Sequence, residues 1–243
     1  DHMQRFNVLW NGSVLAKPCT TGSARAARWK DEPALHLNIV PSRQAQMPKD
    51  WMVNVSSRSA DDGMVRQGWM KDDAPVLWSE WTADGLALRG EIFAHVPGGG
   101  EVTRGDEPLF AWLRLRIHDL CRPLPLDAEY GFILLLEAPA LRASMSTRNF
   151  IVDPGFHPYK RPLRMDPESP APTAGCRVVE PDGKVRIGVA PGTVCRGIAF
   201  APPEEKVPCH RLFLTLPVRR NACVDVLVPM VACDREPFDR ELA

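Results

Sequence analysis

The sequence predicts an all-β protein built from antiparallel strands, with very little helix. Several stretches alternate apolar and polar residues with a period of two, which is typical of strands that bury one face. Asp-Gly pairs separate these stretches, and Asp-Gly favours tight hairpin turns. The 24 prolines are spread along the chain, where they would interrupt almost any helix. A two-sheet sandwich commonly has ~200–250 residues, so the 243 residues fit one such domain.

The clearest alternation covers two strands, at 86–95 and 109–117. In the first, the residues expected to face the core are Leu86, Leu88, Ile92 and Ala94, opposite Arg89, Glu91 and His95. In the second, the expected core residues are Leu109, Ala111, Leu113, Leu115 and Ile117, opposite Phe110, Trp112, Arg114 and Arg116. Alternation over this length predicts half-buried strands of an antiparallel sheet.

Later strands are more apolar. Phe132 to Leu136 contains only apolar residues and predicts a strand that is buried on both faces. Two further strands, rich in Leu and Val, are expected at 211–218 and 222–231. Hairpin turns are expected at Asp62-Gly63, Asp84-Gly85 and Asp182-Gly183.

Irregular structure is expected where proline and glycine gather. Asp153 to Gly175 holds six prolines and predicts a long surface loop, and Pro97 to Gly100 predicts a loop between two strands. A shorter break is expected from Arg43 to Lys49. Near the C-terminus, Asp234 is a candidate helix cap, and Phe238 with Leu242 forms an apolar i,i+4 pair, so a helix is expected to begin there.

These features predict one main domain. Residues 1–3 have the look of a vector remnant, and residues 4–233 are expected to form the β domain. Residues 234–243 are expected to begin a linker helix that leads toward a further domain.

Charge and composition disfavour several classes of partner. The chain has 30 basic and 30 acidic residues, so it lacks the positive field that nucleic-acid binding requires. No run of ~18 apolar residues predicts a membrane-spanning helix. We therefore expect neither nucleic acid nor membrane as a partner. The sequence leaves the compartment open between the cytoplasm and the periplasm or exterior.

The sequence also lacks the common cofactor and catalytic motifs. The seven cysteines include no Cys-x-x-Cys pair, and the six histidines are dispersed, so no metal site is expected. Most cysteines are expected to be reduced and buried, with one or two disulfides as the alternative. Gly-x-Ser-x-Gly and phosphate-binding loops are absent, so no cofactor and no serine hydrolase site are predicted.

Four segments carry a family resemblance. The first three, in chain order, are Gln67 to Trp78, Asp84-Gly-Leu-Ala-Leu-Arg-Gly-Glu-Ile-Phe-Ala94 and Pro108-Leu-Phe-Ala-Trp-Leu-Arg-Leu-Arg116. Together they resemble the N-terminal β-supersandwich of six-hairpin glycoside hydrolases. The closing Val228 to Leu242 segment looks like the exit from that sandwich. The likeness covers about residues 67–243 and implies a galactose-mutarotase-like, two-sheet antiparallel supersandwich.

In that family the general acid and base are expected on a C-terminal helical (α/α)6 toroid. The resemblance therefore implies a non-catalytic domain that packs on the helical catalytic domain of the same parent chain and borders its sugar cleft. It also implies an oligo- or polysaccharide as a partner. The loops at 97–100 and 153–175 are the candidate contacts at the rim of the cleft.

Candidate sugar-contacting residues come from the side-chain chemistry. The flat face of Trp packs on the C–H patches of a sugar ring, and charged side chains at the rim bind its hydroxyl groups. The candidates are Trp78, Trp81, Trp112, Glu80, Glu91 and Arg114. Trp78 and Trp81 are three positions apart on one strand and should point to opposite faces. Large aromatic residues equally fill β-sandwich cores, so a structural role is the alternative for each Trp.

No catalytic residue is assigned. Glu80 and Glu91 could face each other as a carboxylate pair across a hairpin, and the competing interpretation is that they are solvated cross-strand residues. Glu137 is expected to end a strand rather than act as a general acid. Three other functions stay open: a free-standing carbohydrate-binding module that uses the Trp-bearing sheet face, a structural or assembly protein of unknown partner, and a self-sufficient β-sandwich lyase or epimerase. The last would need an exposed cluster of His, Tyr, Arg or carboxylate groups in a cleft.

Overall fold

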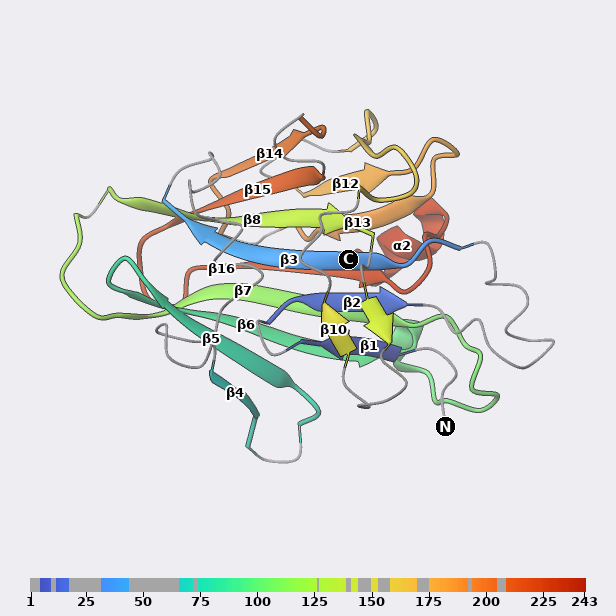
Figure 1. The fold of residues 1–243 in the computed structure, drawn as a ribbon, viewed down its shortest axis with the longest axis horizontal. Helices are drawn as coiled ribbons and strands as arrows, with labels where there is room; N and C mark the ends of the chain where they lie inside the picture. The colour runs from blue at the N-terminus through green and yellow to red at the C-terminus, as the bar shows by residue number, and fades with distance from the viewer. Residues whose placement is uncertain are drawn as a thin grey trace.

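The computed structural model describes residues 5–9, 12–17, 32–43, 66–71, 74–125, 127–138, 141–143, 150–152, 158–169, 175–191, 194–204 and 209–243. These residues form two antiparallel sheets, a two-stranded ribbon and one α-helix (Figure 1). The two sheets share one core. The prediction of an all-β, two-sheet antiparallel sandwich with very little helix is therefore confirmed.

The smaller sheet has six strands in the spatial order β1 (Arg5–Val8), β2 (Val14–Lys17), β3 (Leu35–Ser42), β8 (Glu129–Glu137), β15 (His210–Pro217) and β14 (Gly197–Ala201). The larger sheet has eight, in the order β11 (Arg164–Met165), β12 (Cys176–Val179), β13 (Val185–Val189), β16 (Cys223–Pro229), β7 (Phe110–Leu120), β6 (Leu86–His95), β5 (Leu77–Ala83) and β4 (Arg66–Trp69). The ribbon pairs β9 (Leu141–Ala143) with β10 (Phe150–Val152).

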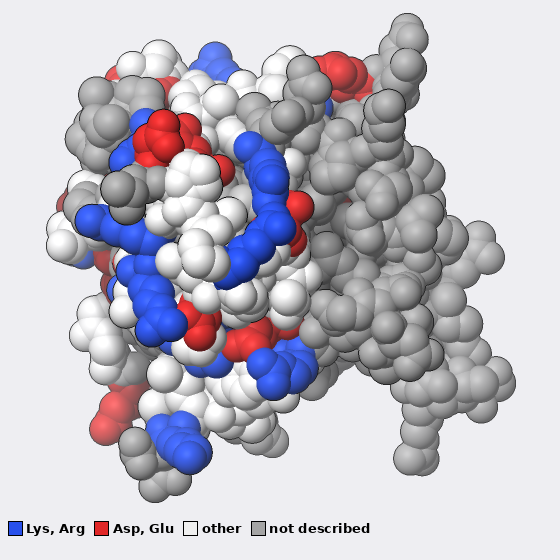
Figure 2. Space-filling view, turned by 90° about the vertical axis from the view of Figure 1, so that its left-hand side faces the viewer, with Lys and Arg blue, Asp and Glu red and all other residues white. Residues whose placement is uncertain are grey.

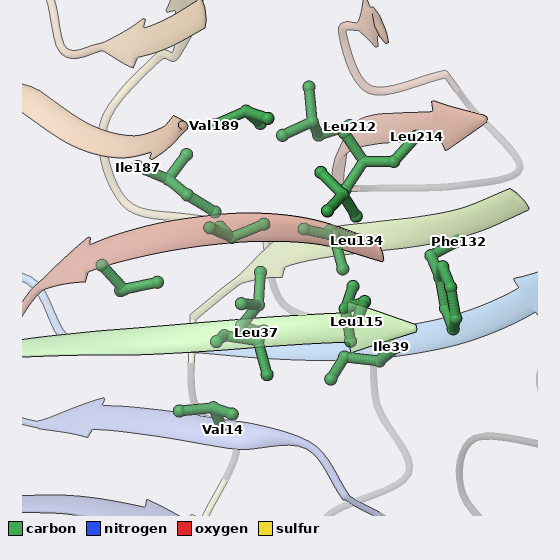
Figure 3. Close-up of a cluster of buried hydrophobic side chains, with 14 of the residues drawn as sticks. Val14, Leu37, Ile39, Leu115, Phe132, Leu134, Ile187, Val189, Leu212 and Leu214 are labelled. Carbon is green, nitrogen blue, oxygen red and sulfur yellow. The ribbon is translucent and has the colours of Figure 1, made fainter. Parts of the chain in front are cut away.

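Apolar side chains of both sheets meet in the core between the two layers (Figure 3). Leu37 and Leu134 of the six-stranded sheet are fully buried, as are Leu115 and Ile187 of the eight-stranded sheet. Each large apolar side chain buried in this way contributes roughly 1.5–3 kcal/mol to stability. The core faces of β6 and β7 are the predicted ones, except that Ala94 lies exposed near the end of β6.

β8 is buried on both faces, as its apolar sequence predicts. The residues on its inner face include Phe132, Leu134 and Leu136, which belong to the main core. On its outer face a second cluster consists of Val40, Ile133, Leu135, Cys209 and Phe213.

Trp81 connects the two sheets. It lies on β5 of the eight-stranded sheet, and 2% of its surface is exposed. A Cβ atom on Gly12, in the turn between β1 and β2, would lie 2.4 Å from Trp81 Cζ2. A Cβ atom on Gly90 of β6 would lie 3.0 Å from Trp81 Cη2. The indole therefore packs directly on the backbone of both glycines, and only glycine leaves room for it at position 12.

The hairpin turns follow the Asp-Gly prediction wherever the structure describes them. Asp84 and Gly85 join β5 to β6, with φ angles of 56° and 82°. Both angles are positive, as a type I′ turn requires. Asp182 and Gly183 join β12 to β13. The Asp62-Gly63 turn lies outside the described residues, as does the break expected at 43–49 apart from Arg43 itself.

The proline-rich segment from Asp153 to Gly175 differs from the prediction of a surface loop. Within its described residues, 158–169 and Gly175, Tyr159 and Leu163 belong to the main core, and β11 pairs with β12 at the sheet edge. Prolines flank this short edge strand, where a missing N–H does not interrupt the ladder. The Pro97–Gly100 loop also contains a short 3-10 turn, η2 (Pro97–Gly99).

The predicted C-terminal helix is present as α2 (Arg235–Leu242). Asp234 precedes its first turn, but its side chain does not form the expected capping hydrogen bond. Phe238 is fully buried on the outer face of the eight-stranded sheet, 6.3 Å from Phe110 between ring centroids. Glu241 accepts hydrogen bonds from His95 and from the Gly98 N–H. Helix α2 therefore lies against the sheet and holds the 97–100 loop. Among the described helices, none combines the length and apolar character that membrane crossing needs.

Candidate functional site

A groove of about 440 Å³ lies on the outer face of the eight-stranded sheet. Its volume is within the range of small-ligand sites, roughly 300–1,000 Å³. The residues that line it are Met70, Val76, Glu91, Phe93, Trp112, Arg114 and Asp225. They come from β6, β7, β16 and the 70–76 segment between β4 and β5.

Strand register builds the floor of the groove. Phe93 of β6 lies directly opposite Trp112 of β7. Two residues along the same strands, Glu91 lies opposite Arg114, and Arg114 lies opposite Asp225 of β16. Because side chains two residues apart share one face of a sheet, an aromatic pair lies next to a row of charged groups.

Apolar side chains form one wall. Met70 and Val76 lie at the two ends of the connection between β4 and β5, where the Met70 N–H donates to the Val76 carbonyl oxygen at 2.9 Å. Met70 and Phe93 are each 39% exposed, a large fraction for apolar side chains. The groove thus offers accessible apolar surface beside its charges.

The charged groups in and beside the groove are paired. Arg114 Nε and Nη2 donate to the two carboxylate oxygens of Asp225 at 2.7 and 2.9 Å. Hydrogen bonding to Asp225 raises the pKa of Arg114 above its ordinary value, so the guanidinium stays charged. Arg116 Nη2 lies 2.5 Å from Glu91 Oε1. Two cations and two anions therefore neutralise one another at this position.

A second ionic cluster adjoins the groove on the same sheet face. Glu80 accepts hydrogen bonds from Arg66 and Arg89, and Arg89 also lies over the Trp78 ring at 4.8 Å. Desolvation acts to raise the pKa of Glu80, but the bonds from Arg89 and Arg66 lower it below its ordinary value. At the end of the molecule where β5 turns into β6, basic and acidic side chains also lie close together (Figure 2).

His118 belongs to this cluster. Its Nε2 atom lies 3.0 Å from Arg89 Nη2. Because a guanidinium can only donate, His118 Nε2 accepts this bond and the ring proton is assigned to Nδ1. Desolvation, followed by the charges of Arg89 and Arg116, lowers the pKa of His118 below its ordinary value. The imidazole is therefore neutral, and its lone pair is already engaged.

The structure brings together three of the six predicted site residues. Trp112, Glu91 and Arg114 line the groove. Trp78 lies on the same sheet face, but Arg89 covers one side of its ring, and Gly68 lies so close that a Cβ there would be 2.7 Å from Trp78 Cζ2. Trp81 points to the opposite face, as predicted, and is enclosed in the core. Of the three tryptophans, only Trp112 thus has a place in the groove.

The pairing of β5 with β6 contradicts the hypothesis that Glu80 faces Glu91 across a hairpin. Glu80 lies opposite Arg89, and Glu91 lies opposite Trp78. Both carboxylates are bound to arginine side chains, and the lowered pKa of Glu80 keeps it anionic. This arrangement does not provide the protonated carboxylic acid that glycoside hydrolysis needs.

Sequence reasoning missed four groove residues: Met70, Val76, Phe93 and Asp225. Phe93 could have been found, because it alternates with Glu91 on the polar face of its strand and is an aromatic exception there. Asp225 could not, because it is 111 residues from Arg114 in the sequence and only the pairing of β16 with β7 brings them together.

A separate cluster of buried polar side chains lies on the six-stranded sheet. It consists of Ser13, His36, Asn38, Glu137 and Cys209. Ser13 Oγ and His36 Nε2 are 3.0 Å apart, and His36 Nδ1 is 3.6 Å from Glu137 Oε2. The Ser–His–Glu order is that of a nucleophilic triad, but 3.6 Å exceeds a hydrogen bond and Ser13 is only 1% exposed.

Burial dominates the chemistry of this cluster. Desolvation raises the pKa of Glu137 to about 7, against smaller opposing effects of its bonds to Asn38 and Cys209. Desolvation lowers the pKa of His36 to about 4, so this imidazole is a weak base. Glu137 is the last residue of β8, as predicted. We assign the cluster a structural role, in which the Asn38 amide of β3 donates to the Glu137 carboxyl group of β8.

The described residues contain no group of three or more His, Cys, Asp or Glu side chains placed to hold a metal ion. The six described cysteines are free thiols, and Cys19 lies outside the described residues. The groove with its Phe93–Trp112 floor and paired charges is the candidate site that these observations leave. No family model matches the chain, and neither the curated proteins nor the solved structures include a match.

Proposed function

We propose that the protein binds carbohydrate in the groove on the outer face of its eight-stranded sheet. The observation that carries this proposal is the Phe93–Trp112 pair, which lines the groove beside the Glu91, Arg114 and Asp225 row. Pyranose rings present C–H patches that pack on aromatic faces, while their hydroxyl groups both donate and accept hydrogen bonds. An apolar floor with a few fixed polar groups meets both needs.

The proposed role is binding without catalysis by this groove. Glu91 is held by Arg116, and Arg114 and Asp225 hold each other. In the adjoining cluster, Glu80 is anionic and the His118 lone pair accepts from Arg89. A lyase or epimerase needs a free base near the substrate, so the pairing of these groups favours a binding module over a self-sufficient enzyme.

A second candidate function follows from the resemblance to glycoside hydrolase supersandwiches. In this alternative, the same region packs on a helical catalytic domain of a parent chain and borders its sugar cleft. Exposed apolar side chains favour it: Trp69 is 66% exposed, and Met70 and Phe93 are also exposed nearby. Apolar surface gathered in this way commonly marks a site for another domain.

Binding measurements on the chain alone separate the two candidates. The protein is titrated calorimetrically against a panel of oligosaccharides, and Trp112→Ala is compared with Trp69→Ala. Both variants remove one indole, but only Trp112 lines the groove. The carbohydrate proposal expects binding that Trp112→Ala weakens by at least about tenfold, equivalent to 1.4 kcal/mol, and that Trp69→Ala leaves unchanged. Absence of saccharide binding to the folded chain would contradict it and leave the packing role.

A further inference from the structure

We infer that the groove selects uncharged sugar residues and rejects acidic ones such as uronates and sulfated sugars. This inference rests on the proposed carbohydrate binding, and it specifies the class of sugar. The selectivity is inferred from the pairing of the charged side chains beside the Phe93–Trp112 floor, because the aromatic floor alone does not distinguish neutral from acidic sugars.

The two ion pairs at the groove, Arg114 with Asp225 and Arg116 with Glu91, have no net charge. Arg114 is neutralised by Asp225, and Arg116 is neutralised by Glu91. The Asp225 and Glu91 side chains are only 19% and 11% exposed. The partial burial of the two carboxylates reduces the screening of each pair by solvent and salt, although the Arg114 side chain is 52% exposed.

A neutral polyol can bind these pairs without separating them. The two hydrogen bonds between Arg114 and Asp225 use only part of the guanidinium's donors and part of the carboxylate's lone pairs. A sugar hydroxyl can accept from the remaining N–H groups and donate to the remaining lone pairs. The paired set therefore offers both hydrogen-bonding roles at once.

An anionic sugar is expected to bind these pairs less well than a neutral one. Its carboxylate or sulfate either accepts from the remaining Arg114 N–H groups, where it lies close to the Asp225 and Glu91 carboxylates, or displaces Asp225 from Arg114. Displacement leaves a partly buried carboxylate without its partner, and the like charges repel. The aromatic floor binds the ring of either sugar, so the selectivity comes from the charged row.

The inference can be tested with two ligands that differ only at C6. Oligogalacturonides and their carboxyl-reduced, neutral galactose counterparts are titrated into the protein. Neutral gluco-, xylo- and manno-oligosaccharides and sulfated oligosaccharides are titrated as a wider panel. Each titration is carried out at low and at high salt. We expect binding to neutral members, unaffected by salt, and at least about tenfold weaker binding to acidic ones. Stronger binding of the acidic members, lost at high salt, would overturn the neutral selectivity while leaving carbohydrate binding intact. Absence of binding to every member would overturn both.

A variant connects the selectivity to the ion pair. Asp225→Asn leaves Arg114 without its carboxylate, so we expect the variant to gain binding to oligogalacturonides, and this binding should weaken with salt. The matched control is Glu129→Gln, which removes a carboxylate from the exposed pair with Arg196 on the six-stranded sheet. Thermal unfolding of both variants checks that they are folded. Unchanged selectivity in folded Asp225→Asn would contradict the assigned role of the pair.

Discussion

Arg114 and Asp225 form two hydrogen bonds across neighbouring strands of the eight-stranded sheet, although 111 residues separate them in the sequence. This pair flanks the aromatic floor of the groove and neutralises the only arginine that lines it within the described residues. Its geometry gives the groove polar hydrogen-bonding capacity without net charge. The proposed sugar site therefore depends on one long-range strand pairing, that of β16 with β7.

Replacing Phe93 by Ala should separate binding from stability. Phe93 is 39% exposed and lies on the groove floor, so truncation should weaken saccharide binding by about tenfold while lowering the unfolding free energy by less than roughly 1 kcal/mol. Calorimetric titration and urea unfolding measure the two effects.

The matched variant is Phe238→Ala on α2. Phe238 is fully buried against Phe110, so its truncation should cost about 3–5 kcal/mol of unfolding free energy. A small loss in Phe238→Ala would show that α2 is not held to the sheet as described. Equal losses in the two variants would contradict their different burial.

Gly12→Ala should destabilise the protein through a clash with Trp81. The new Cβ would lie 2.4 Å from the indole, and residue 12 has a φ angle of 79°. Gly98→Ala is the matched control, because Gly98 also has a positive φ angle, 68°, but no atom lies within 4 Å of the new Cβ. We expect a loss of roughly 1 kcal/mol for Gly98→Ala and roughly 2–4 kcal/mol for Gly12→Ala in urea unfolding. Equal losses would mean that backbone strain alone sets the cost and that Trp81 does not pack on Gly12.

The buried Glu137 should make stability depend on pH. Burial raises its pKa to about 7, from an ordinary value near 4.5, so the folded state binds its proton more tightly than the unfolded state. The resulting stabilisation is present below pH ~4.5 and is lost as the pH rises through 7. His36 acts in the opposite direction, because its pKa falls to about 4 and its contribution is lost as the pH falls below ~6.5.

Glu137→Gln removes the first of these two effects. The stability of the variant relative to the parent protein should therefore rise by roughly 1 kcal/mol between pH 6 and pH 8. Urea unfolding at both pH values measures the change, and Glu129→Gln, at an exposed position, should show a constant difference. A constant difference for Glu137→Gln as well would show that the buried carboxyl does not titrate in this range.

Much of the fold could be predicted from local patterns. The alternation at 86–95 and 109–117 identified the faces of β6 and β7, because the period of two reports which side chains a strand buries. The Asp84-Gly85 pair predicted its hairpin because the two turn residues themselves favour that turn. The proline-rich segment was predicted less well, because Tyr159 and Leu163 enter the core through tertiary packing that no local pattern shows.

The site was only partly predictable. Trp112, Glu91 and Arg114 could be selected because their side-chain chemistry and alternation are visible in one or two strands. The sequence could not distinguish Trp112 from Trp78, because the Arg89 and Gly68 contacts that occupy Trp78 depend on the register of β4, β5 and β6. Asp225 required the pairing of distant strands.

The central claim is that a sugar ring binds on the Phe93–Trp112 floor, and the most direct test observes the tryptophan side chains during a titration. The protein labelled with ¹⁵N is titrated with the neutral oligosaccharide that binds best in the panel, and the indole N–H signals are followed by NMR. We predict that the Trp112 signal shifts in a saturable manner, while the signals of the core Trp81 and the covered Trp78 stay in place. A saturable titration that leaves Trp112 unshifted would contradict the account, because it would place the sugar elsewhere on the molecule.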